Sequence, residues 1–493
     1  MTSPEANAAL RAPEAGRQVI RGGAVRAGGF GLGAIIATAA IAIVTRHLAP
    51  VEFGRFASVM ALVGIITGLS DAGLTIVGAR EVAAHGDPIE RRKLLANLLT
   101  LRLLFAPLAI AIGVAYALLV GWNQTDVAGT ILVGIGLALI NVQGSIMLPL
   151  TVDLRLGIVT SIEILRQLVW LASVIAVVLA GGGIRGFFAG QVVVGLAALV
   201  CLPWLRGTGI QLRPAFDQGA LRSLIFTITP VAASVIVGVI YVRAVMLLTE
   251  QLANPLQTGL FAASFRAFES LWMLPTLLLS VALPVLAVAG GEDRLRLAYA
   301  LRLMTETALL LGILLALVVG FAAGPVIGAL AGPAYRGAAD VMRIQSVALV
   351  ALFVGQAWQL GLLALRAQRS LLIANATALL LVGQLALGLV PRFGAEGSAS
   401  VAVIGESGLA LTLYLLLRAN DRTVAPRLLP LWRVLPPLAL ALVIGSLLRD
   451  HPIISTAAAA GSFVTASLAI GAVPPEIRDA LLRAKPIIDH APS

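Results

Sequence analysis

Long apolar runs recur along the entire chain and constrain its fold more than any other feature. A helix needs roughly 20 apolar residues to cross the hydrocarbon core of a bilayer, and about 14 runs of that kind are present. None of them alternates apolar and polar residues as a transmembrane β-strand does. Because backbone groups in lipid must bond within their own segment, we expect an all-α integral membrane protein. The runs lie at 28–45, 55–78, 98–120, 127–149, 164–180, 186–204, 222–248, 258–290, 299–322, 341–364, 371–391, 396–417, 428–448 and 453–473.

The composition excludes several other classes of protein. Of the 493 residues, 59% are hydrophobic and only 12% are charged, whereas a soluble domain carries about 25% charged residues. A soluble enzyme, a nucleic-acid-binding protein and a disordered chain are therefore excluded. The single cysteine, Cys201, allows neither an internal disulfide nor a cysteine metal site. The histidines are scattered along the chain, so we expect no bound metal and no cofactor.

Basic residues are distributed unevenly between the loops on the two sides of the membrane. With the N-terminus inside, the inner segments hold 24 lysines and arginines and the outer loops hold seven. Lysine and arginine in short loops accumulate on the cytoplasmic side of a membrane. The sequence before the first run is too long and too mixed for a cleaved signal peptide. We therefore expect a multi-pass protein of the cytoplasmic membrane with both termini in the cytoplasm.

The chain resembles itself when it is shifted by 205 residues. The shift aligns Gly54 with Gly259 and Phe56 with Phe261, near the starts of the second and eighth runs. It predicts two six-helix lobes of the same orientation, related by an axis along the membrane normal, plus two C-terminal helices. The expected segments are a cytoplasmic N-terminal segment (1–27), an N-lobe (28–205), a cytoplasmic linker (206–221), a C-lobe (222–418), the last two helices (428–473) and a cytoplasmic tail (474–493).

Two short patterns near the N-terminus carry the most specific signal. The first outer loop has the pattern Arg-x-Leu-x-Pro-x-x-Phe-Gly, formed by Arg46, Leu48, Pro50, Phe53 and Gly54. The last part of the second run contains Asp-x-Gly-Leu, and Arg-Glu follows the run; the residues are Asp71, Gly73, Leu74, Arg80 and Glu81. These patterns resemble the polysaccharide, or O-antigen, flippase family of the multidrug/oligosaccharidyl-lipid/polysaccharide (MOP) exporter superfamily. We interpret them as structural: Pro50 and Gly54 would form a tight outer turn, and Phe53 would lie at the membrane interface.

The resemblance implies a function in transport. Members of that family flip an undecaprenyl-diphosphate-linked oligosaccharide from the inner to the outer face of the bacterial cytoplasmic membrane, for polysaccharide export. It also implies alternating access between two lobes around a wet, cationic cavity, without covalent chemistry and hence without enzyme activity. The implied partners are the lipid-linked oligosaccharide, membrane lipids, and the machinery that polymerises and exports the polysaccharide, with no nucleic acid.

Charged residues inside the predicted spans form the candidate site. A charge at mid-bilayer is unfavourable by roughly 2.5–3.5 kcal/mol and often marks a transport pathway. In the family's architecture spans one, two, seven and eight line the cavity, which makes Arg26, Arg243 and Arg266 the candidates for binding the diphosphate. A guanidinium suits phosphate because it donates two parallel hydrogen bonds. The alternative for Arg26, as for Arg102 and Arg166, is that the side chain snorkels to the cytoplasmic interface.

Three acidic residues are candidates for ion coupling or for pairing within the cavity: Asp71, Glu269 and Glu406. Glu269 follows Arg266 by three residues, so the two share a helix face and can pair. Asp71 either pairs with an arginine or carries a coupling proton. Glu406 has no basic neighbour in the sequence, so it is either protonated in apolar surroundings or paired across helices.

Other functions stay open on this sequence. A multidrug exporter of the same superfamily would need fewer cationic positions and typically has twelve spans, and the Phe53-Gly54 pattern fits a lipid II flippase less well. A membrane glycosyltransferase or polymerase would need carboxylates on sizeable outer loops. The outer loops are short and their acidic residues are scattered singly, which disfavours an enzyme.

Overall fold

The protein is helical, without any strand, throughout the residues that its computed structural model describes. Nine helices in this part of the chain are long and apolar enough to cross a membrane, and three shorter apolar helices accompany them. Within the described residues, each predicted span coincides with a helix, a pair of helices or half of a helix. The second part of the eighth predicted span, 281–290, lies outside the described residues. The all-α membrane fold is therefore confirmed. The described residues are 13–84, 87–153, 155–200, 214–280, 294–427 and 429–478.

The chain divides into two compact units. Unit 1 comprises Met1–Leu48 and Ser58–Val239, and unit 2 comprises Ala49–Ala57 and Ile240–Ser493. Two helices pass from one unit into the other: α3 (Pro50–Asp71) after Ala57, and α9 (Gln218–Leu252) after Val239. The lobe limits expected from the sequence stay a prediction.

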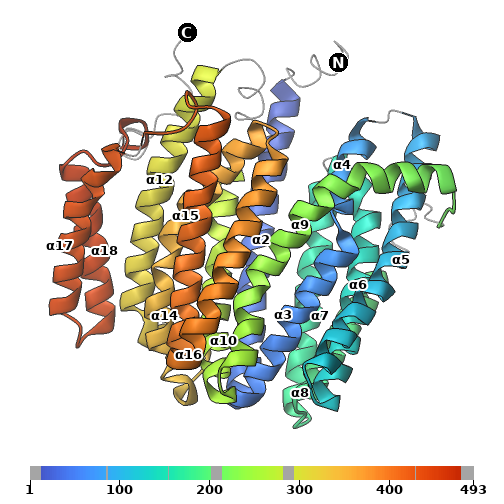
Figure 1. Cartoon of the computed structure of the whole chain (residues 1–493), viewed down its shortest axis with the longest axis horizontal. Coiled ribbons are helices and arrows are strands. Elements are labelled where there is room, and N and C mark those ends of the chain that lie inside the picture. The colour runs from blue at the N-terminus through green and yellow to red at the C-terminus, as the bar shows by residue number, and fades with distance from the viewer. Residues whose placement is uncertain are drawn as a thin grey trace. The chain divides into compact units, whose positions relative to one another are not determined.

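Unit 1 is a helical bundle (Figure 1). Besides α3 and the first part of α9 it contains α2 (Pro13–His47), α4 (Leu74–Ala84), α5 (Pro88–Leu119), α6 (Gln124–Val152), α7 (Leu156–Leu179) and α8 (Ile184–Val200). A core forms where α4, α5 and α9 meet, with Leu74 and Leu98 packed against Leu224. Glycine permits a close approach of α2 to α7, because a Cβ on Gly29 would lie 2.0 Å from Cγ2 of Thr160.

Unit 2 is a second bundle that ends in a helical hairpin. It contains α10 (Pro255–Ser280), α12 (Arg294–Phe321), α13 (Ala323–Leu330), η2 (Pro333–Tyr335), α14 (Ala338–Ser346), α15 (Ala348–Ala364), α16 (Gln368–Asn420), η3 (Leu429–Val434), α17 (Leu435–Leu447) and α18 (Pro452–Ala469). Helices α12, α15 and α16 run side by side around a core that includes Phe353, Trp358 and Tyr414 (Figure 1). The α17–α18 hairpin packs on α12 through Phe463.

Helix α16 reverses direction at Gly394 and supplies two of the predicted spans. The φ of Gly394 is 56°, a left-handed conformation that glycine adopts without strain. The two halves then run antiparallel: a Cβ on Gly405 would lie 2.6 Å from Cγ2 of Val382. At the far end Nδ2 of Asn420 donates to Oγ of Ser370 at 2.9 Å.

The internal repeat has a counterpart in the structure. Helices α3 and α10 begin at Pro50 and Pro255, which are separated by the same shift of 205 residues. Their first turns cross within unit 2 at the aligned glycines. A Cβ on Gly54 would lie 2.9 Å from the nitrogen of Gly259, and a Cβ on Gly259 would lie 1.9 Å from the oxygen of Pro50. Equivalent positions of the two repeats are therefore in backbone contact, as elements related by a two-fold axis can be.

This crossing corrects the interpretation of the outer-loop motif. Gly54 is not part of the turn, because α2 ends at His47 and α3 already begins at Pro50. Phe53 does not lie at an interface, since its side chain is fully buried, edge-on to Tyr335 with ring centroids 6.1 Å apart. The motif instead builds the packing of α3 against α10.

Candidate functional site

Two arginines share one glutamate in unit 2. Arg243 of α9 donates from Nη1 to Oε1 of Glu269 at 2.6 Å, and Arg266 of α10 donates from Nη1 to Oε2 at 2.7 Å. Three of the residues singled out from the sequence are thus brought together. We call them the arginine cluster; it carries one net positive charge.

Arg266 lies near the middle of α10, and Arg243 lies in the last third of α9. Arg266 follows the start of α10 at Pro255 by about three turns, or about 16 Å, which is half of a hydrocarbon core of about 30 Å. The three side chains are 22 to 24% exposed. Among the described residues each guanidinium uses one N–H group on Glu269, which leaves further N–H groups that can bind a ligand. A phosphate oxygen is the kind of acceptor that this arrangement suits.

Packing on another face of α10 fixes the direction in which the arginine cluster points. Phe261 and Phe268 lie on one face of the helix and are buried. Ser264, on the same face, donates to the side-chain oxygen of Gln345 in α14. The arginine cluster lies around the helix from this packed face. The anchoring therefore keeps Arg266 from being drawn into the core of unit 2.

A second buried polar pair joins α9 to α16. The hydroxyl of Tyr241 donates to Oε1 of Glu406 at 2.8 Å, and the two residues are 4% and 8% exposed. Tyr241 precedes Arg243 by two residues, so the two side chains leave nearly opposite sides of α9. Helix α9 therefore carries both polar groups, one toward α10 and one toward α16.

Unit 1 holds a third polar cluster, built around Arg102 of α5. Its Nη2 donates to Oδ1 of Asp71 at 2.7 Å and to Oγ1 of Thr75 at 2.5 Å. Its Nη1 donates to the backbone oxygen of Asn141 in α6. Since Asp71 ends α3 and Thr75 lies in the first turn of α4, one guanidinium ties together the two sides of a helix break.

The helix break explains the Asp-x-Gly-Leu pattern. Ala72 and Gly73 have φ values of 41° and 79°, the left-handed region that favours glycine. The expectation that Arg102 snorkels is wrong, because its side chain is only 5% exposed and is bonded inside the bundle. Asp71 is its partner, although 31 residues separate the two. The combination of a mid-span aspartate, a glycine and a mid-span arginine is the signal that could have indicated the pair.

Two further predicted positions lie elsewhere. Arg26 belongs to α2, but its side chain is outside the described residues. Arg166 of α7 pairs with Glu163, one turn earlier on the same helix, and is 22% exposed. Arg166 is therefore not part of the arginine cluster.

Comparisons with known proteins show what the fold resembles. No protein-family model and no curated protein match the sequence. The lipid II flippase MurJ, in an inward closed conformation, matches with a TM-score of 0.73 at 11% identity, over 92% of this chain and 99% of that chain. This chain has the fold of MOP superfamily transporters. A multidrug resistance MATE family transporter of that superfamily, in its inward-facing conformation, matches with a TM-score of 0.60 at 16% identity, over 82% and 98% of the two chains.

A third match shows the same fold. A MOP superfamily transporter from Pyrococcus furiosus matches with a TM-score of 0.56 at 14% identity, over 83% of this chain and 96% of that chain. Each of the three alignments covers at least 96% of the matched transporter chain. The shared architecture of a multi-pass membrane protein is therefore established for almost the entire chain.

Proposed function

We propose that this protein is a flippase for an undecaprenyl-diphosphate-linked oligosaccharide in the bacterial cytoplasmic membrane, acting in polysaccharide export by alternating access between two lobes. The observation that carries the proposal is the arginine cluster, in which two guanidinium groups share one carboxylate between two apolar helices. A site with net positive charge attracts an anionic diphosphate and repels a cationic drug. The fold, shared with a lipid II flippase, supports a lipid-linked substrate.

The arginine cluster would receive the diphosphate by exchange of partners. Without substrate, Glu269 holds Arg243 and Arg266 together, which lowers the electrostatic cost of two like charges in a membrane. An incoming diphosphate offers oxygens that accept parallel hydrogen bonds from each guanidinium. The headgroup would cross on this cationic site while the polyprenyl tail stays in lipid. No covalent bond forms or breaks.

A lipid II flippase is the second candidate, and the TM-score of 0.73 with MurJ favours it. Lipid II is also a sugar on a polyprenyl diphosphate, so the arginine cluster suits either substrate. A multidrug exporter is the third candidate, supported by the likeness to MATE transporters. The net positive charge of the arginine cluster disfavours a multidrug exporter of cationic drugs, because like charges repel each other.

Reconstitution in liposomes tests the proposal. Fluorescent undecaprenyl-diphosphate oligosaccharide is incorporated, and a membrane-impermeant quencher added outside reports which leaflet the label occupies. We expect the protein to make the entire pool accessible, while liposomes without protein expose only the outer half. Movement of labelled lipid II alone would support the second candidate. Uptake of a cationic dye without lipid movement would support the multidrug exporter.

Glu406→Gln is expected to abolish the response of transport to an ion gradient. Asp71 and Glu269 are paired with arginines, whereas Glu406 has only the hydroxyl of Tyr241 as partner among the described residues. An ionisable group in a membrane without a paired charge is a natural site for proton or cation uptake. Glutamine keeps the hydrogen bond and removes the charge. The measurement compares translocation with and without a pH or sodium gradient, with the exposed Glu396→Gln as control. An unchanged gradient response would exclude Glu406 from coupling.

A further inference from the structure

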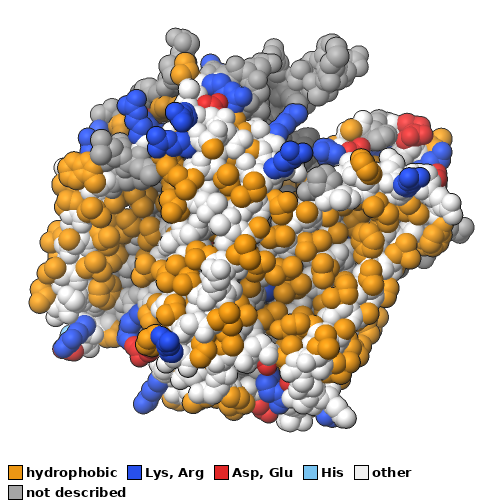
Figure 2. Space-filling view, viewed as in Figure 1, with side chains coloured by type: hydrophobic (Ala, Val, Ile, Leu, Met, Phe, Trp, Pro, Cys, Tyr) orange, Lys and Arg blue, Asp and Glu red, His pale blue; other side chains and the backbone are white. Residues whose placement is uncertain are grey.

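Exposed arginines gather at one end of unit 2, at a distance from the arginine cluster. They lie in the α15–α16 turn, in the first and last turns of α16 and in the linker that follows it. Five of them are exposed and have no acidic partner among the described residues: Arg366, Arg369, Arg418, Arg422 and Arg427. We call these five residues the basic rim. Figure 2 shows basic side chains gathered at this end of the unit, beside a broad hydrophobic belt.

Contacts between elements place the basic rim on one surface. The hydrogen bond from Asn420 to Ser370 brings the start and the end of α16 together. The linker after α16 is held on the bundle by Val424, which is fully buried. It is also held by the hydroxyl of Tyr414, which donates to the backbone oxygen of Pro426 at 3.3 Å. The arginines are therefore presented by a fixed segment of chain.

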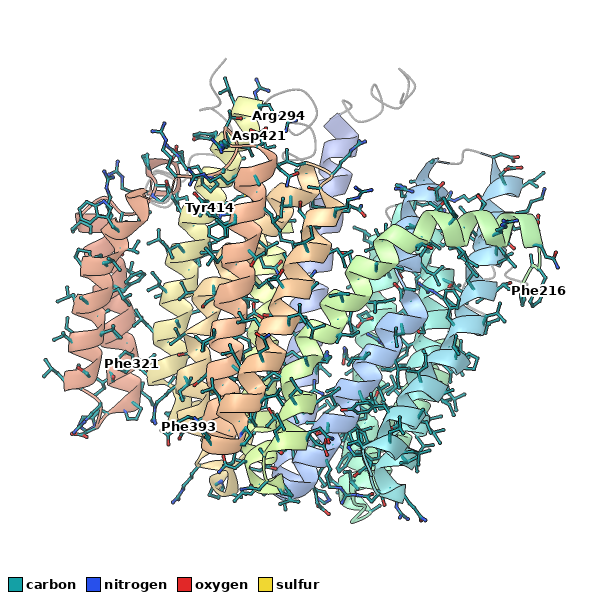
Figure 3. All side chains as sticks on the ribbon, viewed as in Figure 1. Phe216, Arg294, Phe321, Phe393, Tyr414 and Asp421 are labelled. Atoms are coloured by element: carbon teal, nitrogen blue, oxygen red, sulfur yellow. The ribbon has the colours of Figure 1, made fainter. Side chains whose placement is uncertain are left out.

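The acidic residue of this linker does not neutralise the basic rim. Asp421 accepts hydrogen bonds from Oγ1 and the backbone nitrogen of Thr423 at 2.6 and 2.9 Å, and pairs with Arg294 at 3.4 Å. Figure 3 shows Asp421 and Arg294 together at this end. The hydrogen bonds from Thr423, with the charge of Arg294, lower the pKa of Asp421 below its ordinary value. Asp421 is therefore ionised near neutral pH and already satisfied.

An aromatic side chain lies close to the basic rim in the chain. The linker continues into η3, where Trp432 is 60% exposed, and Leu435 at the start of α17 is 59% exposed. Tryptophan is enriched at the level of lipid headgroups because its ring is apolar and its N–H is polar. Arginines beside exposed apolar side chains are typical of a segment at a membrane surface.

We propose that the basic rim and Trp432 form a binding site for an anionic phospholipid. The guanidinium groups would donate paired hydrogen bonds to the phosphate, and the Trp432 ring would lie at the level of the glycerol. A surface whose arginines have no acidic partner among the described residues prefers an anionic headgroup over a zwitterionic one, because each arginine near the surface adds to the attraction. The site lies within unit 2, and it does not depend on the proposed transport function.

Two triple variants in lipid nanodiscs test the site. The test variant carries Arg418→Gln, Arg422→Gln and Arg427→Gln. The matched control carries Arg336→Gln, Arg392→Gln and Arg449→Gln, which removes three exposed arginines from the opposite end of unit 2. Each protein is titrated with phosphatidylglycerol or phosphatidylcholine, and native mass spectrometry counts the lipids that are retained. Thermal unfolding confirms that both variants are folded.

Wild type and control are expected to retain phosphatidylglycerol in preference to phosphatidylcholine. In the test variant phosphatidylglycerol affinity should fall by about fivefold for each arginine, or about a hundredfold in total at low salt. Equal affinity in the test variant and the control would overturn the proposal, as would equal retention of the two lipids by wild type. If the triple variant does not fold, single substitutions are titrated instead, with about a fivefold loss expected for each.

Fluorescence quenching tests the role of Trp432 separately. Phosphatidylglycerol with brominated acyl chains quenches tryptophans that lie within contact of the lipid. The chain has six tryptophans, so the signal of Trp432 is taken as the difference between wild type and Trp432→Phe. We expect that difference to be quenched by brominated phosphatidylglycerol and to recover in the test variant. A difference signal that is insensitive to the lipid would remove Trp432 from the site.

Discussion

Replacing Gly259 with alanine is expected to destabilise the protein by about 3 kcal/mol or more, because overpacking that must move backbone exceeds the usual range of about 1–3 kcal/mol. The new Cβ would lie 1.9 Å from the oxygen and 2.5 Å from the carbonyl carbon of Pro50. The obstacle is backbone, so no change of rotamer relieves the clash. Alanine otherwise favours a helix over glycine by about 1 kcal/mol. The expected loss of stability therefore comes entirely from the clash at the α3–α10 crossing, because helix propensity alone would favour alanine.

Gly328→Ala is the matched control, because a Cβ on this helical glycine of α13 meets nothing within 4 Å. Its melting temperature should equal or exceed that of wild type. Gly54→Ala, whose Cβ would lie 2.9 Å from the nitrogen of Gly259, should fall between the two. The measurement is thermal unfolding of the purified proteins in one detergent. A melting temperature of Gly259→Ala equal to that of wild type would mean that the two helices do not cross in this way.

Arg102→Ala is expected to destabilise unit 1 by up to about 3–5 kcal/mol, the usual effect of removing one partner of a buried ion pair, because Arg102 is only 5% exposed while Asp71 is 23% exposed. The substitution leaves Asp71 without its cation and removes the donors that reach Thr75 and Asn141. Since Arg102 bonds to both sides of the break between α3 and α4, its loss should also loosen that break. Hydrogen exchange of the amides in residues 71–78 is expected to increase.

A double-mutant cycle with the single variants Asp71→Asn and Arg102→Met isolates the interaction between the two side chains. In Asp71→Asn/Arg102→Met neither charge remains, so the double variant should be more stable than the sum of the single effects allows. Arg91→Ala is the control, because its partner Asp153 is 44% exposed and such pairs contribute about 0–1 kcal/mol. If Arg102→Ala destabilised the protein no more than Arg91→Ala does, Arg102 would not be a structural residue.

The spans were predictable because hydrophobic length is a local property that the bilayer fixes. The run at 299–322 coincides with α12, Arg294–Phe321. The break after Asp71 was not predicted, since the apolar run at 55–78 continues through it without a change in hydropathy. The break between α3 and α4 is stabilised by Arg102 of α5, a side chain from another helix, so the hydropathy of residues 55–78 does not reveal it.

The candidate site was predictable only in part. The pairing of Arg266 with Glu269 follows from their spacing on one helix. The pairing of Tyr241 with Glu406, which are 165 residues apart, does not. It depends on how each helix is rotated about its axis, and a helix that is apolar on all sides does not specify that rotation.

The internal repeat indicated more than the presence of two lobes. The 205-residue shift pairs Gly54 with Gly259, and these two glycines are the ones in contact. Positions that lie on or near a two-fold axis meet their own equivalents. A pair of glycines at equivalent positions of a repeat is therefore a signal for a helix crossing. The sequence analysis instead assigned Gly54 to an outer turn.

Translocation by arginine-cluster variants tests most directly whether this site carries a lipid diphosphate. The triple variant Arg243→Gln/Arg266→Gln/Glu269→Gln removes the net charge without leaving a carboxylate unpaired. Arg266→Gln/Glu269→Gln keeps the single charge of Arg243 and serves as the matched control. With labelled undecaprenyl-diphosphate oligosaccharide in liposomes, we expect the triple variant to lose about a hundredfold in rate or more, because hydrogen bonds to charged groups contribute about 1.5–3 kcal/mol each. The control should lose less. A folded triple variant that translocates the lipid at the wild-type rate would contradict the assignment.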